Sequence, residues 1–220
     1  MDAMQKRQVS ARTLRQSLAK KNSETTDKGL ERARAILDAA RDIFASEGFA
    51  ALSMRSVAAR VGVSLSTVQH YYRSKEALLE ALLVYTLESY QAAIDRITGE
   101  MAGASRLEQF AAAVDVLIDV IRAPLTRGVF VEIWALANRH AYAARIVKDM
   151  QNRERRTLYR LIRGLNEAIS DKEYEQRAAL IAAQLEGVMM RVALRGVHPA
   201  EAQRLAAAAR QSFIRLATEP

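Results

Sequence analysis

A chain of 220 residues with 3 prolines and no cysteine can form one large domain or two small ones, and it excludes a disulfide scaffold and thiolate chemistry. Alanine and leucine recur at helical spacing without period-two alternation of β-branched residues, which predicts an all-α protein. The net charge is +8, and residues 1–75 hold 14 Lys and Arg against 7 Asp and Glu, a net +7. Such a local excess attracts a polyanion, although a solvated surface without a partner explains it equally well.

Residues 1–26 show no core-forming pattern and carry six basic residues against Asp2 and Glu24. We expect a flexible basic tail, which could serve as a DNA arm, a dispensable extension or a transit peptide. No apolar run approaches the roughly 18 residues of a membrane span, and the N-terminus lacks the apolar block of a secretory signal. We therefore expect a soluble, cytoplasmic protein without a membrane partner.

Three short helices are predicted next, over 28–47, 54–61 and 65–72. The first has one apolar stripe at helical spacing, made of Ala33, Ile36, Leu37, Ala40, Ile43 and Phe44. Ser53 and Ser64 are typical N-caps for the second and third helices, and Gly62 supplies the turn between them. This arrangement predicts a helix-turn-helix.

The outer face of the third helix is polar and carries Ser66, Thr67, Gln69 and His70, with Tyr71 near its boundary. A helix that reads the DNA major groove needs such a face, because glutamine can bridge two groups on adenine and a threonine methyl can pack on thymine. Lys75, in the first turn of the next helix, would reach a phosphate. A polar face on a short helix is more commonly just a solvated face, so the combination with the caps and the local charge favours DNA binding.

Residues 30–80 resemble the N-terminal domain of TetR-type (TetR/AcrR) bacterial transcriptional regulators. The matching segment is ILDAARDIFASEGFAALSMRSVAARVGVSLSTVQHYYRSKEALLEAL. The resemblance implies a homodimer that binds palindromic operator DNA, usually as a repressor. It also implies a DNA-binding domain over 27–75 and an effector-binding and dimerisation domain over 76–220.

The resemblance implies DNA-contacting roles for nine positions: Ser53, Arg55, Ser64, Ser66, Thr67, Gln69, His70, Tyr71 and Lys75. The first three stand where the family contacts backbone or bases, the next five on the recognition face, and Lys75 on a phosphate-contacting helix start. The chain departs from the family pattern at Ser66, where glycine or alanine is common, and at Gln69, where an aromatic is common. We expect these departures to change the operator that is read.

Six further helices are predicted over 75–98, 107–121, 126–137, 141–169, 171–195 and 199–218, which makes about nine in total. The helix over 75–98 would span about 36 Å and link the two halves mechanically. Bulky apolar residues with scattered polar ones suit a small organic effector, and the candidates are Tyr85, Phe110, Val114, Leu117, Phe130, Trp134, Asn138, Met150 and Met189. Each of these is more commonly plain core.

The apolar stripes of the last two helices predict a four-helix dimer interface, with an intramolecular core as the alternative. The interface candidates are Ile181, Leu185, Val188, Met189, Val192, Leu205, Ala206, Ala209 and Phe213. No reactive constellation indicates an enzyme, because His70, His140 and His198 lie in three separate contexts, and we expect no metal or cofactor. The alternative to a regulator is a helical ligand-binding or protein-interaction module without sequence-specific DNA binding.

Overall fold

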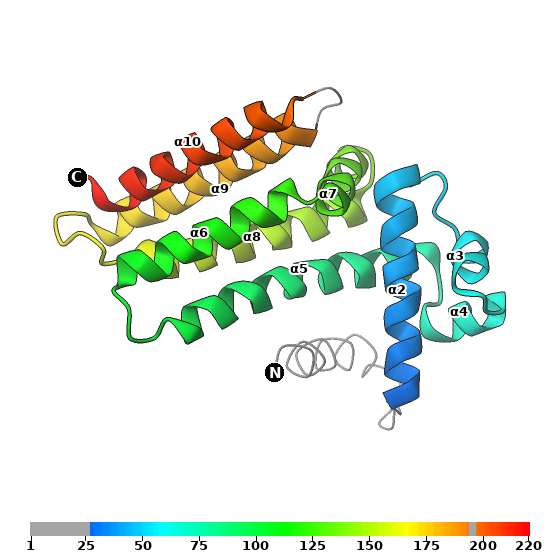
Figure 1. Ribbon diagram of the computed structural model, residues 1–220. Coiled ribbons are helices and arrows are strands. Elements are labelled where there is room, and N and C mark those ends of the chain that lie inside the picture. The colour runs from blue at the N-terminus through cyan, green and yellow to red at the C-terminus, as the bar shows by residue number, and fades with distance from the viewer. Residues whose placement is uncertain (1–26, 194–196) are drawn as a thin grey trace. The chain divides into compact units, whose positions relative to one another are not determined.

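A computed structural model describes residues 27–193 and 197–220, and every regular element in these ranges is an α-helix (Figure 1). The all-α prediction is confirmed, and the basic tail predicted at 1–26 lies outside the described residues. The described helices are α2 (Asp27–Glu47), α3 (Met54–Val61), α4 (Leu65–Tyr71), α5 (Lys75–Glu100), α6 (Arg106–Arg122), α7 (Pro124–Ala137), α8 (Ala141–Ile162), α9 (Asp171–Ala193) and α10 (Pro199–Thr218). None of these helices is both long and apolar enough to cross a membrane.

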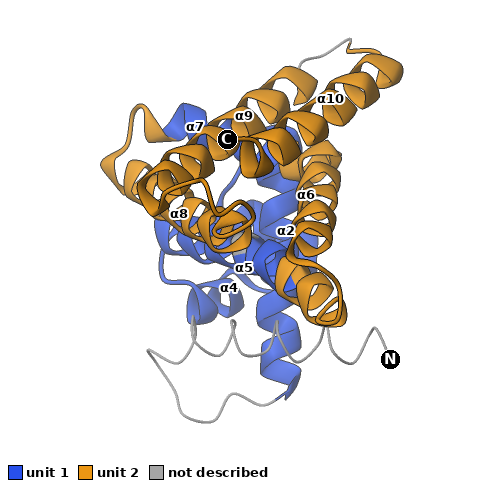
Figure 2. Ribbon diagram, turned by 90° about the vertical axis from the view of Figure 1, so that its left-hand side faces the viewer, with its two compact units in different colours: residues 1–92, 128–136 blue, residues 93–127, 137–220 orange. Residues whose placement is uncertain are grey.

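The chain divides into two compact units, coloured separately in Figure 2. Among the described residues, unit 1 comprises 27–92 and 128–136, and unit 2 comprises 93–127, 137–193 and 197–220. The expected boundary after residue 75 differs from this division, because most of α5 and the middle of α7 belong to unit 1. Apolar burial explains part of the difference, since Leu78, Leu79 and Leu82 on α5 have no exposed surface.

Unit 1 is built around the apolar stripe of α2, whose six predicted residues are all at most 1% exposed. Helix α3 packs on α2, and α4 packs on α3, which buries Val57 and Val68 completely. The Tyr72 hydroxyl donates a hydrogen bond to the Ala33 carbonyl at 3.3 Å, and burial raises the pKa of this phenol well above its usual range. The interior therefore fixes the orientation of the short helices and leaves their outer faces in solvent.

Unit 2 is a packed set of helices in which α9 contacts α6, α8 and α10, and α6 also contacts α8 and α10. Its largest fully buried side chains are Tyr174, Phe110 and Phe213. An exposed ion pair joins Arg210 on α10 to Asp115 on α6, with Nε 2.6 Å from Oδ1. Such an exposed pair contributes little, so apolar burial carries most of the stability of this unit.

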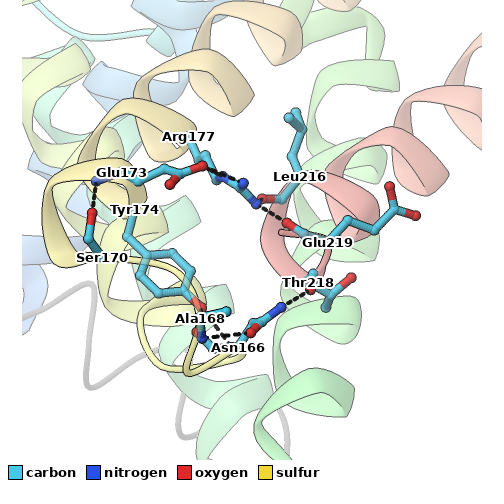
Figure 3. Close-up of polar contacts among 9 residues, drawn as sticks. All are labelled: Asn166, Ala168, Ser170, Glu173, Tyr174, Arg177, Leu216, Thr218 and Glu219. Carbon is cyan, nitrogen blue, oxygen red and sulfur yellow. Dashed lines mark hydrogen bonds and ion pairs between the residues drawn. The ribbon is translucent and has the colours of Figure 1, made fainter.

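Helix α8 ends at Ile162, seven residues before the end expected at Ile169. Apolar spacing continues past this point, but Gly164 adopts a left-handed φ of 77° and breaks the helix. Asn166, in the loop that follows, makes two hydrogen bonds (Figure 3). Its backbone amide donates to the Tyr174 hydroxyl at 2.7 Å, and its side-chain Nδ2 donates to the Thr218 carbonyl at 2.7 Å. These bonds hold the α8–α9 loop against the last turn of α10.

Candidate DNA-binding surface

Helix α3 begins with a complete capping box. The Ser56 amide donates to Ser53 Oγ at 2.9 Å, and the Ser53 amide donates to Ser56 Oγ at 2.9 Å. Both bonds satisfy amides that have no partner within the helix. The Ser53 side chain is therefore engaged in capping, which the sequence predicted, while its contact with DNA stays a prediction.

The turn between α3 and α4 depends on Gly62 and Ser64. Gly62 has a φ of 71°, and its amide donates to the carbonyls of Ala58 and Ala59, which ends α3 in a left-handed cap. Ser64 Oγ accepts the Thr67 amide at 3.1 Å and lies 2.8 Å from the hydroxyls of Ser66 and Thr67. The hydroxyls at the start of α4 thus form one small network, which restricts their rotamers before any ligand arrives.

The outer face of α4 is available to a partner. Gln69 and His70 are exposed, as is Arg55 on α3. The side chains of Arg55 and Gln69 make no hydrogen bond or ion pair with the part of the chain that the structure describes. His70 lies edge-on to the Tyr71 ring, with centroids 5.3 Å apart. The face therefore combines free amide and guanidinium donors with two aromatic rings.

An open groove of about 470 Å³ borders this face, and the sequence reasoning missed two of its residues. Lys28 and Arg32 line it from the first turns of α2, opposite Ser64, Thr67 and Tyr71 from the turn and α4. The groove is a tertiary feature that joins segments more than 30 residues apart. The only signal in the sequence was the spacing of two basic residues, four apart, at the start of a helix.

Lys75 departs from the role that was expected for it. Its ammonium group donates to the Phe49 carbonyl at 2.6 Å and lies 3.6 Å from the centroid of the Phe49 ring. Burial lowers the pKa of the Lys75 side chain, partly offset by the nearby Glu76 carboxylate. The side chain expected to face a DNA phosphate is thus half-buried and hydrogen-bonded within unit 1.

Family models match both halves of the chain. The model of bacterial regulatory proteins of the tetR family matches residues 36–82, and the C-terminal model of BetI-type transcriptional repressors matches residues 105–215, which is half of the chain. The chain belongs to the TetR family. The resemblance stated from the sequence is thereby confirmed.

Named relatives of this TetR-family protein are transcriptional regulators. It is 30% identical to the HTH-type regulator UidR of Escherichia coli over 115 residues, 52% of this chain and 56% of UidR. The chain thus aligns with little more than half the length of that relative. It is 28% identical to the regulator BetI of Rhizobium meliloti over 165 residues, 74% of this chain and 79% of BetI.

Solved structures share the fold of this TetR-family protein. Salmonella enterica GusR superposes with a TM-score of 0.66 and 25% identity, covering 89% of this chain and 98% of GusR. A transcriptional regulator from Saccharomonospora viridis, solved in complex with choline, gives a TM-score of 0.68 at 20% identity, covering 84% of this chain and 96% of that one.

The nine predicted pocket residues of the TetR-family protein divide between the two units. Tyr85, Phe130 and Trp134 lie in unit 1, whereas Phe110, Val114, Leu117, Asn138, Met150 and Met189 lie in unit 2. Their environments differ, since Phe110 and Val114 have no exposed surface while Asn138 is exposed. In unit 1, Phe130 stacks on Tyr90 with centroids 6.4 Å apart, and the buried Trp134 Nε1 has no hydrogen-bond partner among the described residues.

The predicted dimer stripe faces the inside of unit 2. Seven of the nine residues are at most 8% exposed within one chain: Ile181, Leu185, Met189, Val192, Ala206, Ala209 and Phe213. Only Val188 and Leu205 keep part of their surface. A side chain already buried in its own chain has little area left for a second copy, so the seven buried positions follow the intramolecular alternative. The two readings share the same apolar periodicity, which is why the sequence could not separate them.

Proposed function

We propose that this TetR-family protein is a DNA-binding transcriptional regulator, a homodimeric repressor that a small organic effector releases from a palindromic operator. The observation that carries the proposal is the exposed polar face of α4, whose Gln69 side chain makes no hydrogen bond or ion pair within the described chain. A short helix with free donors, fixed by caps at both ends of the preceding turn, is suited to the major groove. Lys28, Arg32 and Arg55 add positive charge around it.

In the proposed complex, phosphate contacts position the DNA-binding head, which is the helix-turn-helix with α2, and base contacts specify the sequence. We propose the first role for Arg55, Lys28 and Arg32. We propose the second for five residues of the α4 face: Ser66, Thr67, Gln69, His70 and Tyr71. Ser66 and Gln69 replace residues more usual in the family, and we expect Gln69 with its neighbour His70 to set operator preference. In a dimer, two such heads would read half-sites roughly 34–36 Å apart.

We propose that the dimer forms through the exposed side of α9, opposite its buried stripe. Leu180 is 46% exposed and Met190 is 39% exposed, and with about 3.6 residues per turn they share one helix face with Ala183 and Gly187. Exposed apolar residues interleaved with small ones allow two helices to approach closely, and a two-fold interface would bring this face onto itself.

For the effector, a small organic cation is the class we propose. The support comes from unit 2, where Glu186 on α9 accepts a hydrogen bond from Gln151 on α8 at 3.0 Å. Burial and the neighbouring Glu186 carboxylate raise the pKa of Glu154 to about 8, and burial raises that of Glu186. A bound cation would relieve the repulsion between these carboxyl groups. Choline, present in the Saccharomonospora viridis structure, is the first probe to test.

A mobility-shift experiment with the promoter region of the protein's own gene tests the regulator proposal. We expect a sequence-selective shift at low salt that unlabelled promoter DNA competes away and that unrelated DNA does not. The absence of any selective shift, with the protein shown to be folded, would favour the interaction-module alternative. Choline titrated into the shifted complex then tests the effector class, with release of DNA expected.

A further inference from the structure

A corner of the chain between α2 and α3 is held from two sides in unit 1. Gly48 ends α2 with a left-handed φ of 85°, and Phe49 follows it. The Phe49 amide donates to Glu132 Oε2 on α7 at 3.0 Å, and the Phe49 carbonyl accepts from Lys75 Nζ on α5 at 2.6 Å. The two polar groups of one residue are therefore bound by side chains of opposite charge from two different helices.

Two glycines allow α7 to approach this corner closely. The φ of Gly48 is one that other residues rarely adopt, and an added Cβ would also lie only 3.3 Å from Glu132 Oε2, so glycine suits both the turn and the approach of the carboxylate. A Cβ added at Gly128 on α7 would lie 2.3 Å from the Ala45 carbonyl oxygen at the end of α2. Helix α7 thus meets the last turn of α2 backbone to backbone, and Glu132 stands one helical turn further on.

We propose that Glu132 is a positioning residue for the DNA-binding head, and that Lys75 works with it inside the protein instead of binding a DNA phosphate. Together they form a corner clamp, defined here as Glu132, Lys75 and the Phe49 peptide groups between them. The corner leads in four residues to Ser53, the N-cap of α3, so the clamp sets where α3 and the reading helix α4 begin. This inference rests on the proposed function for its consequence on DNA, but the clamp itself is a property of the protein alone.

The charge and the surroundings of Lys75 favour its contact with Phe49. Its single ammonium group faces both a carbonyl oxygen and the face of an aromatic ring, which are favourable partners for a partly desolvated cation. A move to a DNA phosphate would leave the Phe49 carbonyl without this donor. Lys28, in contrast, is exposed and lines the groove beside α4, so it is the better matched cation for a phosphate.

Two measurements on the full-length protein test the inference. The first is amide hydrogen exchange at Phe49, which needs no DNA. In Glu132→Ala we expect exchange at least about 10-fold faster than in the wild type, because the amide loses its acceptor. Glu132→Gln, which keeps an acceptor oxygen, should restore most of the protection, and Glu80→Ala, which removes an exposed carboxylate from α5, should leave Phe49 unchanged.

The second measurement is the salt dependence of binding to a labelled duplex from the protein's own promoter. Each phosphate contact contributes about 0.9 to the slope of log K against log salt. We expect Lys28→Gln to lower the slope by about that amount, while Lys75→Gln weakens binding at every salt concentration without changing the slope.

A slope for Lys75→Gln that falls as much as for Lys28→Gln would overturn the internal role of Lys75, and unchanged Phe49 exchange in Glu132→Ala would overturn the clamp. If the wild type binds no duplex, the proposed function fails, and Phe49 exchange in Glu132→Ala and Lys75→Gln still decides the clamp.

Discussion

The close approach of α7 to α2 predicts that Gly128→Ala destabilises the protein, and the distances give the size of the effect. In Gly128→Ala, the new methyl group would lie 2.3 Å from the Ala45 carbonyl oxygen and 2.9 Å from its carbonyl carbon, both backbone atoms that cannot rotate away. The helices must separate by about 1 Å to reach ordinary contact, and overpacking of this kind costs about 1–3 kcal/mol. Alanine recovers about 0.5–1 kcal/mol of helix propensity. Because the clashing atoms are backbone, we take the upper part of the overpacking range, which leaves an expected net loss of about 1–2 kcal/mol.

The assay is thermal and urea unfolding at one fixed protein concentration, because dimerisation would make the midpoint depend on concentration. For a chain of this size, 1 kcal/mol moves the midpoint by about 2–4 °C, which predicts a drop of roughly 2–8 °C. Gly99→Ala is the matched control, since Gly99 also lies in a helix but has no atom within 4 Å of an added Cβ. If Gly128→Ala were as stable as this control, the close approach of α7 to α2 would be refuted.

Three further predictions concern recognition, titration and assembly. Gln69→Ala should lose about 1–3 kcal/mol of discrimination between operator and mutated operator, measured by competition, whereas equal loss on both would argue against base contact. Glu154→Gln should remove a pH dependence of stability. Folding raises the pKa of the Glu154 carboxyl from 4.5 to about 8, so the wild type should lose stability as the pH rises from 4.5 to 8. We expect this loss to be on the order of 2 kcal/mol after solvent screening. Parallel wild-type and variant melting curves from pH 5 to 9 would contradict this. Leu180→Glu should shift the protein toward monomer in sedimentation, and an unchanged dimer would place the interface elsewhere.

Local signals in the sequence were sufficient for the helix-turn-helix. Ser53, Gly62 and Ser64 act within three or four residues of their own positions, so their capping roles follow from residue type and spacing alone. The apolar stripe of α2 was equally predictable, because a helix presents one face to its core. These are features of local secondary structure, which residues close together along the chain determine.

Features that depend on distant segments were not predictable. The early end of α8 had a different, local cause: apolar spacing through Leu165 and Ile169 suggested that the helix continued, but Gly164 ended it in a left-handed conformation. The stripe on α9 indicated burial without stating whether the partner was the same chain or a second copy. The contact of Glu132 with Phe49 joins residues 83 apart, and nothing in either local sequence marks it.

The composition of unit 1 has a consequence for exchanging DNA-binding heads between members of the TetR family. Residues 128–136 of α7 belong with the head although more than 30 residues separate them from the end of its main segment. A chimera joined only after the helix-turn-helix would pair the Gly48–Phe49 corner with a foreign α7, which need not supply Gly128 or Glu132 at matching positions. A transplanted DNA-binding unit therefore has to include two segments of the chain, which takes three junctions in the gene, and recombination at a single junction would leave out the part contributed by α7.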